Sequence, residues 1–256
     1  MGSSDFEDCS VVITGGCSGI GKATADLMLR EGARVAVIDL PGVVSQASND
    51  EIFAVGADVT DERSVTAAMA QIGETHGGID ILVNNAGIGA QGTVADGDVS
   101  EWMHVLDVNV LGIVRVTRAA LPYLRKSTKA AVVNTCSIAA TAGLPKRALY
   151  SASKGAVMSL TLAMAADHLR EGIRVNCVNP GTTDTPWIAG LLANAADPDY
   201  EREALAARQP HGRMVTPSEV AEAIAYPASP RATSTVGAVL AVDGGMQGLR
   251  LRPARP

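Results

Sequence analysis

The strongest constraint in this sequence is the regular alternation of short apolar runs with longer helix-like segments. Each run is rich in β-branched residues and nearly continuous in apolar character, which is typical of strands buried on both faces. We expect strands at 11–14, 33–39, 52–55, 79–84, 130–136, 173–178 and 236–242. Helical patterns lie between them, at about 19–31, 62–75, 100–125, 149–171 and 217–225. This alternation predicts an α/β fold with a doubly wound parallel sheet of about seven strands.

One segment breaks the alternation. Residues 181–210 separate the sixth predicted strand from the last predicted helix and mix prolines and a tryptophan with charged helix formers. A long excursion inside a compact domain is usually functional, and we interpret it as a lid. No internal repeat or long linker divides the 256 residues, so we predict one domain over 1–256.

The composition excludes several classes of protein. Hydrophobic residues make up 47% of the chain, which is enough for a sizeable core. The net charge of -6, with only two Trp, four Tyr and two Phe, argues against a nucleic-acid partner. No apolar run reaches the roughly 18 residues of a membrane span, and the first residues lack the features of a secretory signal. The four cysteines have no C-x-x-C spacing and the four histidines are scattered. We therefore expect a cytoplasmic protein without a metal, disulfide framework or membrane partner.

A glycine-rich loop follows the first predicted strand and leads into the first helix. From Thr14 to Gly21 it has the spacing T-G-x-x-x-G-x-G. Glycines permit a tight turn and a close approach to a pyrophosphate, and the helix N-terminus supplies free N–H groups. The position between strand and helix distinguishes the loop from an ordinary glycine-rich loop. The residues predicted to bind a dinucleotide here are Gly15, Cys17, Ser18, Gly19 and Ile20.

An aspartate at the end of the second predicted strand indicates which dinucleotide binds. Asp39 lies 18 residues after Gly21, where a carboxylate can accept hydrogen bonds from the adenosine ribose of NAD. Its charge would repel the 2′-phosphate of NADP, and residues 15–21 contain no Lys or Arg to neutralise that phosphate. A solvated aspartate is the alternative. We also expect the cofactor to pass residues after the third and fourth strands, namely Asp58, Val59, Asn85, Ala86 and Gly87.

Four residues form a candidate proton-transfer group. Tyr150 and Lys154 have i, i+4 spacing on a predicted helix, so their side chains share one face. The lysine charge favours the phenolate, which makes the phenol a usable acid or base. Ser137, at the end of the fifth predicted strand, can hold a substrate oxygen beside the phenol. Asn109 is a polar amide within an apolar helical stretch, where its presence indicates a specific role.

In this combination the chain resembles the short-chain dehydrogenase/reductase family over nearly its whole length. The matching motifs are T-G-x-x-x-G-x-G at 14–21, N-N-A-G at 84–87, Asn109, Ser137, Y-x-x-x-K at 150–154, P-G at 180–181 and V-D-G-G at 242–245. The resemblance implies a Rossmann-type sheet, an NAD(P) cofactor and, usually, a homotetramer. The chain departs from the family at 226–230, where Pro227 stands in place of an unbroken helix.

The resemblance also implies a role for each motif residue. Tyr150 would be the general acid/base and Ser137 would orient the carbonyl. Lys154 would bind the nicotinamide ribose and tune Tyr150, while Asn109 would hold a water in a proton relay. The nicotinamide end would meet Pro180, Gly181, Thr183 and Thr185.

Two arginines and a tryptophan bear on the substrate. Arg147 lies one helical turn before Tyr150, and Arg208 lies at the end of the lid. An arginine pair near a catalytic tyrosine suggests a carboxylate clamp; the alternative is that both are surface charges. Both positions resemble type 2 3-hydroxybutyrate dehydrogenases and 2-keto-3-deoxy sugar-acid dehydrogenases. Trp187 is expected to form a wall of the substrate pocket.

Three functions are compatible with these residues. The first is an NAD-dependent oxidoreductase that interconverts a secondary alcohol and a ketone on a hydroxy acid or sugar acid. The second is an NADPH-dependent 3-oxoacyl carrier-protein reductase or general carbonyl reductase, against which Asp39 argues. The third is a catalytically silent NAD-sensing protein. The complete set of Asn109, Ser137, Tyr150 and Lys154 argues against the third, because a silent site does not need all four.

Overall fold

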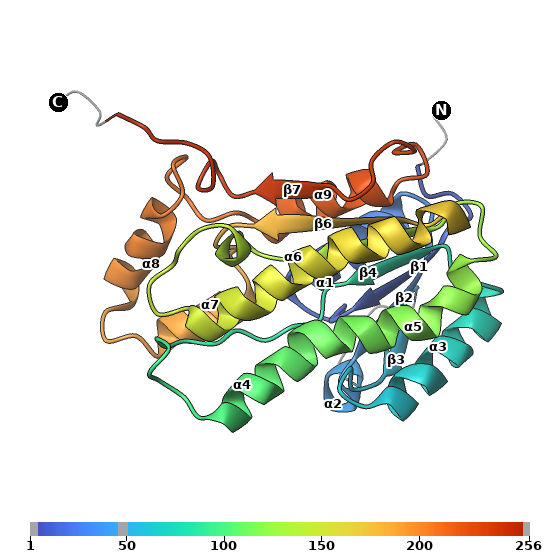
Figure 1. Cartoon of the computed structure of the whole chain (residues 1–256), viewed down its shortest axis with the longest axis horizontal. Helices are drawn as coiled ribbons and strands as arrows, with labels where there is room; N and C mark the ends of the chain where they lie inside the picture. The colour runs from blue at the N-terminus through green and yellow to red at the C-terminus, as the bar shows by residue number, and fades with distance from the viewer. Residues whose placement is uncertain (1–4, 46–50, 253–256) are drawn as a thin grey trace.

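The computed structural model describes residues 5–45 and 51–252, and its centre is one parallel sheet with the strand order β3-β2-β1-β4-β5-β6-β7 (Figure 1). The strands are β1 (Ser10–Thr14), β2 (Arg34–Asp39), β3 (Phe53–Gly56), β4 (Ile81–Asn84), β5 (Ala131–Thr135), β6 (Arg174–Pro180) and β7 (Val239–Val242). All seven predicted strands are confirmed, with ends displaced by up to three residues. Every residue of β1, β4, β5 and β6 is buried, which explains their continuous apolar sequence.

The strand order reverses between β1 and β4. These two strands pair directly, with Val12 opposite Leu82, although two other strands and their helices separate them in sequence. A reversal of this kind leaves a crevice at the carboxyl ends of the two strands, which is where open α/β sheets bind their ligands. Thr14 and Asn84 end the strands at that point.

Helices cover both faces of the sheet, as predicted. The helices on one face are α1 (Gly19–Arg30) and α9 (Pro217–Ala228), and those on the other are α3 (Glu62–His76), α4 (Val99–Leu106), α5 (Gly112–Leu124) and α6 (Ala148–His168). Each layer buries one apolar stripe of its helices against the sheet, for example Ala25 and Met28 of α1. The doubly wound α/β architecture is therefore confirmed.

The segment predicted as one helix at 100–125 has an interruption. A π-helical turn (Asp107–Leu111) joins α4 to α5. Such turns place an extra residue in a helix and are frequent at functional sites. Asn109 lies inside this turn and is buried, so the turn sets the direction in which its amide points.

The lid contains two helices that the periodicity did not predict, α7 (Pro186–Ala193) and α8 (Pro198–Ala207). Both lie beyond the carboxyl ends of the strands, at the left of Figure 1. A third unpredicted helix, α2 (Pro41–Val44), follows β2. The start of the lid is joined to the chain that follows it by backbone hydrogen bonds, from Val215 N to Thr182 O (2.9 Å) and from Asp184 N to Val215 O (2.9 Å). The lid is therefore a closed loop fixed at its base.

The end of α9 corrects the expectation raised by Pro227. The predicted helix stops at 225, but α9 continues to Ala228 with the proline in its last turn. The carbonyls at the end of α9 have no partner within the helix. The Arg174 guanidinium donates to the carbonyls of Pro227 (2.6 Å), Ser229 (3.0 Å), Ala232 (3.2 Å) and Ala228 (3.4 Å). The free carbonyls of a helix end attract a cation, which explains why this arginine is buried without a carboxylate.

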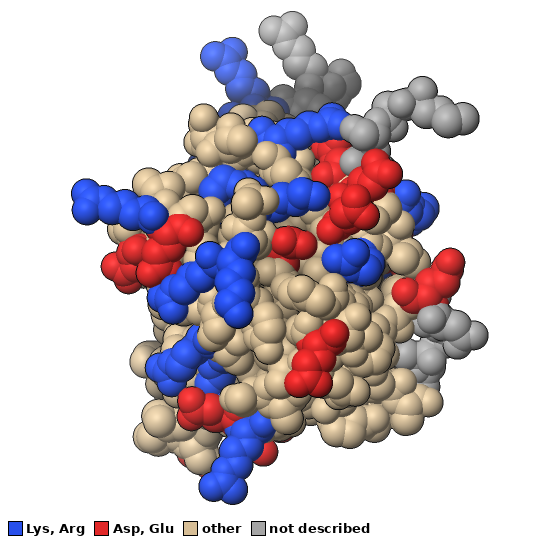
Figure 2. Space-filling model, turned by 90° about the vertical axis from the view of Figure 1, so that its right-hand side faces the viewer, with Lys and Arg blue, Asp and Glu red and all other residues tan. Residues whose placement is uncertain are grey.

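Within the described ranges, no helix is both long and apolar enough to span a bilayer. The four cysteines are free thiols, and only Cys17 is not fully buried. Figure 2 shows the face on the side away from the lid, where basic and acidic side chains are interspersed.

Candidate active site

Two adjoining cavities of about 390 and 210 Å³ lie at the carboxyl end of the sheet, beneath the lid. Predicted cofactor residues line the larger cavity: Gly15, Ser18, Gly19, Ile20, Asp39, Asp58, Val59, Asn85, Ala86, Gly87 and Thr185. The smaller one is lined by the predicted catalytic, nicotinamide-end and substrate residues Ser137, Tyr150, Lys154, Pro180, Gly181, Thr183, Arg147, Trp187 and Arg208. Cys17 and Asn109 are the predicted site residues that line neither.

The glycine loop leaves room for a ligand. Gly15 and Gly19 have positive φ angles, +64° and +52°, which disfavour any other residue. A Cβ on Gly21 would collide with the Gly15 carbonyl, so the helix can start this close to the strand only with glycine. Ser18 precedes α1 in an extended conformation and makes no side-chain cap hydrogen bond. The first N–H groups of α1 therefore remain available to an anion, and the loop fits a dinucleotide pyrophosphate.

The Asp39 carboxylate is held at the mouth of the larger cavity. Its Oδ2 accepts from the Cys17 N–H (3.1 Å) and its Oδ1 accepts from the Leu40 N–H (2.9 Å). The Cys17 backbone thus helps to hold the Asp39 carboxylate in place. Burial and the nearby Asp39 charge raise the pKa of the Cys17 thiol to about 11, so the thiol stays neutral. A fixed carboxylate beside a neutral thiol offers no cation to a phosphate.

Asn85 fixes the loop after β4 against the glycine loop. Its Nδ2 donates to the carbonyls of Thr14 and Gly15 (both 3.2 Å), and its backbone N–H donates to Thr14 Oγ1 (3.0 Å). Asp58 is used within its own turn, where Oδ1 accepts from the backbone N–H and the hydroxyl of Thr60 (2.8 and 2.7 Å). Both residues therefore shape the larger cavity through the backbone as well as line it.

Tyr150 and Lys154 lie on one face of α6, as their spacing predicts. The Lys154 ammonium is 5.8 Å from the centre of the Tyr150 ring and donates to the Thr135 carbonyl (2.9 Å) at the end of β5. Lys154 is buried, whereas Tyr150 is only half-buried and faces the cavity. The Cys136 thiol donates to the Lys154 carbonyl (3.0 Å), which further ties α6 to β5. The lysine charge is therefore fixed beside the tyrosine.

Ser137 begins a short 3₁₀ turn (Ile138–Ala140) directly after β5. Its Oγ accepts from the Ala139 N–H (3.1 Å), so its hydroxyl proton remains available to a substrate oxygen. The residue is buried and lines the smaller cavity with Tyr150.

Asn109 lies behind the cavity rather than in it. Its Oδ1 accepts from the Ile88 N–H (2.8 Å), and its Nδ2 donates to the Ile88 carbonyl (2.9 Å) and to Ser153 Oγ (3.1 Å). Both amide hydrogens are thus used to hold the loop after β4 against α6. A relay water would have only acceptor lone pairs of this side chain to bind.

Arg147 starts α6 next to a strained residue. Lys146 has a positive φ of 55°, a conformation that costs energy in any residue with a side chain. Backbone hydrogen bonds from Gly92 N to Lys146 O (3.0 Å) and from Ala148 N to Gly92 O (3.1 Å) hold the chain in place. Burial, followed by the nearby Arg208 charge, lowers the pKa of the Arg147 guanidinium. Both arginines line the smaller cavity, and the Glu201 charge acts on Arg147 in the opposite direction to that of Arg208.

Arg208 and Trp187 come from the lid. Arg208 is the C-cap of α8, and its guanidinium makes no hydrogen bond or ion pair with the described residues. The Trp187 indole lies against Gly89, where any Cβ would collide with it, and it borders both cavities. The lid also packs closely against the glycine loop: a Cβ on Gly19 would lie only 3.3 Å from Thr185 Cγ2.

Two residues important to this arrangement were not predicted from the sequence. Gly89 gives Trp187 its place, and Gln209 is buried directly beside Arg208. Gly89 belongs to a glycine-containing loop after a strand, and this position could have identified it as part of the site. Gln209 belongs to no motif and was detectable only as an amide among charged residues.

Comparison with known proteins identifies the family. A family model described as enoyl-(acyl carrier protein) reductase matches residues 15–247. The chain is 41% identical over 244 residues to 2-(S)-hydroxypropyl-CoM dehydrogenase 3 of Xanthobacter autotrophicus, covering 92% of this chain and 95% of that protein. It is 40% identical over 251 residues to cis-4-hydroxycyclohexanecarboxylate dehydrogenase of Sinomonas cyclohexanicum, covering 94% and 97%. The ligand-free aldohexose dehydrogenase of Thermoplasma acidophilum matches with a TM-score of 0.90 at 33% identity and full coverage of both chains.

These matches cover nearly the whole chain and agree with its sheet and motifs. The chain therefore belongs to the short-chain dehydrogenase/reductase family. It is accordingly an oxidoreductase of the class that uses a nicotinamide cofactor.

Proposed function

We propose that this protein is an NAD-dependent dehydrogenase that interconverts a secondary alcohol and a ketone on a substrate with an anionic group, such as a hydroxy acid or sugar acid. The observation that carries the proposal is the convergence of Tyr150, Arg147 and Arg208 on one cavity. Two guanidinium groups that line one cavity with a candidate acid/base suit a carboxylate that binds both. Relatives named for a secondary alcohol and for a hydroxycyclohexanecarboxylate support the same reaction.

In this proposal, a bound nicotinamide supplies or accepts the hydride. During oxidation, Tyr150 Oη takes the proton of the substrate hydroxyl, and during reduction it returns a proton to the carbonyl oxygen. The Lys154 ammonium stabilises the phenolate form that takes the proton. The Ser137 hydroxyl donates a hydrogen bond to the reacting oxygen. Asn109 keeps the loop and α6 in register through Ile88 and Ser153.

The preference for NAD rests on Asp39. Its carboxylate is fixed by the N–H groups of Cys17 and Leu40, so it cannot turn away from a 2′-phosphate. A phosphate placed against a carboxylate costs several kcal/mol. The same argument disfavours an NADPH-dependent carrier-protein or carbonyl reductase. The presence of Ser137, Tyr150 and Lys154 around one cavity disfavours a silent NAD-sensing protein.

Replacing each arginine by methionine tests the anion clamp, because methionine keeps much of the length but removes the charge. We expect Arg147→Met and Arg208→Met each to raise KM for a hydroxy acid by about 10–150-fold, since a hydrogen bond to a charged group contributes about 1.5–3 kcal/mol. Suitable probes are 3-hydroxybutyrate and cis-4-hydroxycyclohexanecarboxylate, each compared with its methyl ester.

A control for these variants is Arg202→Met, which removes an exposed arginine of the same lid helix that pairs with Asp184 (3.8 Å) outside the cavity. It should leave KM unchanged within about 2-fold, as surface changes usually do. If neither cavity variant alters KM for the acids, the clamp is wrong while the dehydrogenase assignment survives.

A further inference from the structure

Gln209 occupies an unusual place for a glutamine. It follows Arg208 directly at the end of α8, and it is only 1% exposed. It lies where three parts of the chain meet: the lid helix, the end of β6, and the strap (209–215) that leads from the lid to α9. Arg208 itself is half-buried and lines the substrate cavity.

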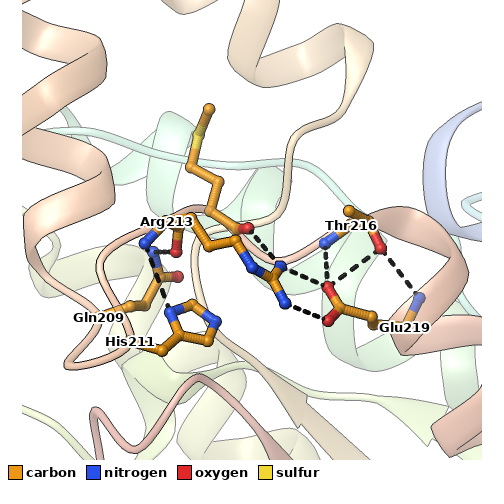
Figure 3. A network of polar contacts seen from close by, with 6 residues as sticks. Gln209, His211, Arg213, Thr216 and Glu219 are labelled. Carbon is orange, nitrogen blue, oxygen red and sulfur yellow. Dashed lines mark hydrogen bonds and ion pairs between the residues drawn. The ribbon is translucent and has the colours of Figure 1, made fainter.

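The Gln209 amide joins these three parts. Its Nε2 donates to the Leu205 carbonyl in the last turn of α8 (3.3 Å). The same Nε2 donates to the Arg213 carbonyl in the strap (2.8 Å; Figure 3). Its Oε1 packs on Gly181 at the end of β6, where a Cβ would approach to 2.7 Å. That oxygen has no hydrogen-bond partner among the described residues. A buried acceptor without a partner is destabilising. If the side chain only filled space here, an apolar residue would therefore be more stable than glutamine.

The strap is in turn anchored to the body of the molecule. The Arg213 guanidinium donates to both carboxylate oxygens of Glu219 (2.8 and 2.6 Å) and to the Met214 carbonyl (3.1 Å). Glu219 also accepts from the N–H and hydroxyl of Thr216, closing the capping box of α9. The Arg213 hydrogen bonds lower the pKa of Glu219 to about 2, so this anchor stays charged throughout the neutral range.

Arg208 needs such a support. Its guanidinium lines the cavity, and no carboxylate of the described chain forms an ion pair with it. Because this side chain has no partner of its own, the position of its backbone decides which part of the cavity the guanidinium can reach. Gln209 fixes that backbone on both sides, through the turn before it and the strap after it.

We propose that Gln209 is a positioning residue that holds Arg208 toward the anionic group of the substrate. This inference rests on the proposed function, because it requires Arg208 to bind that group. It assigns Gln209 no contact with substrate or cofactor. Its effect passes through the direction of the Arg208 side chain.

The test is a double-mutant cycle with the two acids and their methyl esters as probes. Gln209→Met keeps the length and removes both donors. We expect it to raise KM for the acid by about 10-fold, because displacements of about 1 Å at a binding group have effects of this size or larger. The ester KM, kcat and the dissociation constant of NADH should stay unchanged. In an Arg208→Met background the same change should have no further effect on KM for the acid.

Two further variants keep the test decisive. Gln71→Met, on the exposed face of α3, controls for the substitution itself and should change nothing. Glu219→Gln weakens the anchor from its exposed end, so it tests the same support if Gln209→Met does not fold, and it should raise KM for the acid more than for the ester.

The outcomes separate this inference from the proposed function. If Arg208→Met itself leaves KM for the acid unchanged, the proposed clamp fails and this inference fails with it. If Arg208→Met raises KM but Gln209→Met does not, or raises it equally for acid and ester, only the positioning role is refuted. An undiminished effect of Gln209→Met in the Arg208→Met background would also refute it.

Discussion

The proposed proton transfer depends on one atom, the phenol oxygen of Tyr150. Tyr150→Phe keeps the ring that packs in the cluster with Leu149 and Trp102 but removes the acid. We expect turnover to fall by about 10²–10⁴-fold, the usual contribution of general acid–base catalysis. NADH binding, measured by fluorescence titration, should stay within about 2-fold, because the phenol is not needed to hold the dinucleotide. Near-normal turnover in this variant would show that another group moves the proton.

Asp39 should set the choice of cofactor through its charge. The unmodified enzyme should have a kcat/KM for NAD at least about 100-fold above that for NADP, since like charges brought together cost several kcal/mol. Asp39→Asn keeps the shape and one acceptor oxygen, so it should improve NADP and weaken NAD. The measurement is the initial rate with each cofactor at a saturating alcohol. Equal efficiency with both cofactors before mutation would contradict the assignment.

At the residue scale, the sequence predicted what local spacing determines. Tyr150 and Lys154 share a face because i, i+4 positions must do so in a helix, and the structure places them together. The glycine loop was predicted from its place between strand and helix. Gln209 could not be predicted, because its role depends on Gly181, which it meets only in the folded chain.

Among the elements, α9 depends on a residue from the sheet. Arg174 of β6 caps the carboxyl end of α9 through the four carbonyls described above. Arg174→Met should lower the free energy of unfolding by about 2–4 kcal/mol, because it leaves buried carbonyls unpaired. Urea denaturation measures this loss. Arg170→Met, at an exposed arginine nearby in sequence, should change it by less than about 0.5 kcal/mol. Equal stability of the two variants would show that Arg174 does not stabilise the end of α9.

The elements differ in how well the sequence predicts them. The strands were found because burial on both faces leaves an unbroken apolar run. Helices α7 and α8 were missed because their periodicity is short and irregular, although each has a start signal, Thr185-Pro186 and Asp197-Pro198. The π-helical turn at Asp107–Leu111 has no local signature beyond the polar Asn109, since the amide contacts that accompany it come from Ile88 and Ser153.

The molecule as a whole exposes an apolar groove along α4 and the π-helical turn. It is lined by Met103, Leu106, Val110 and Leu111, and Met103 is 61% exposed. Apolar surface of this kind commonly packs against another subunit. We expect a symmetric homo-oligomer, most simply a tetramer, and dissociation when Met103→Glu and Leu111→Glu are combined. Light scattering at micromolar concentration checks both, and a monomeric unmodified protein would refute the expectation.

The central claim is that one cavity joins NAD-dependent alcohol oxidation to recognition of an anion. The most direct measurement is kcat/KM of the unmodified enzyme for a hydroxy acid and for its methyl ester, each with NAD and with NADP. The methyl esters of 3-hydroxybutyrate and cis-4-hydroxycyclohexanecarboxylate lack the charge of the acids and carry one additional methyl group. For at least one of the two acids, we expect kcat/KM with NAD to exceed that of the same acid with NADP, and that of its ester with either cofactor, by about 10-fold or more. Equal efficiency with the ester, or with NADP, would contradict it.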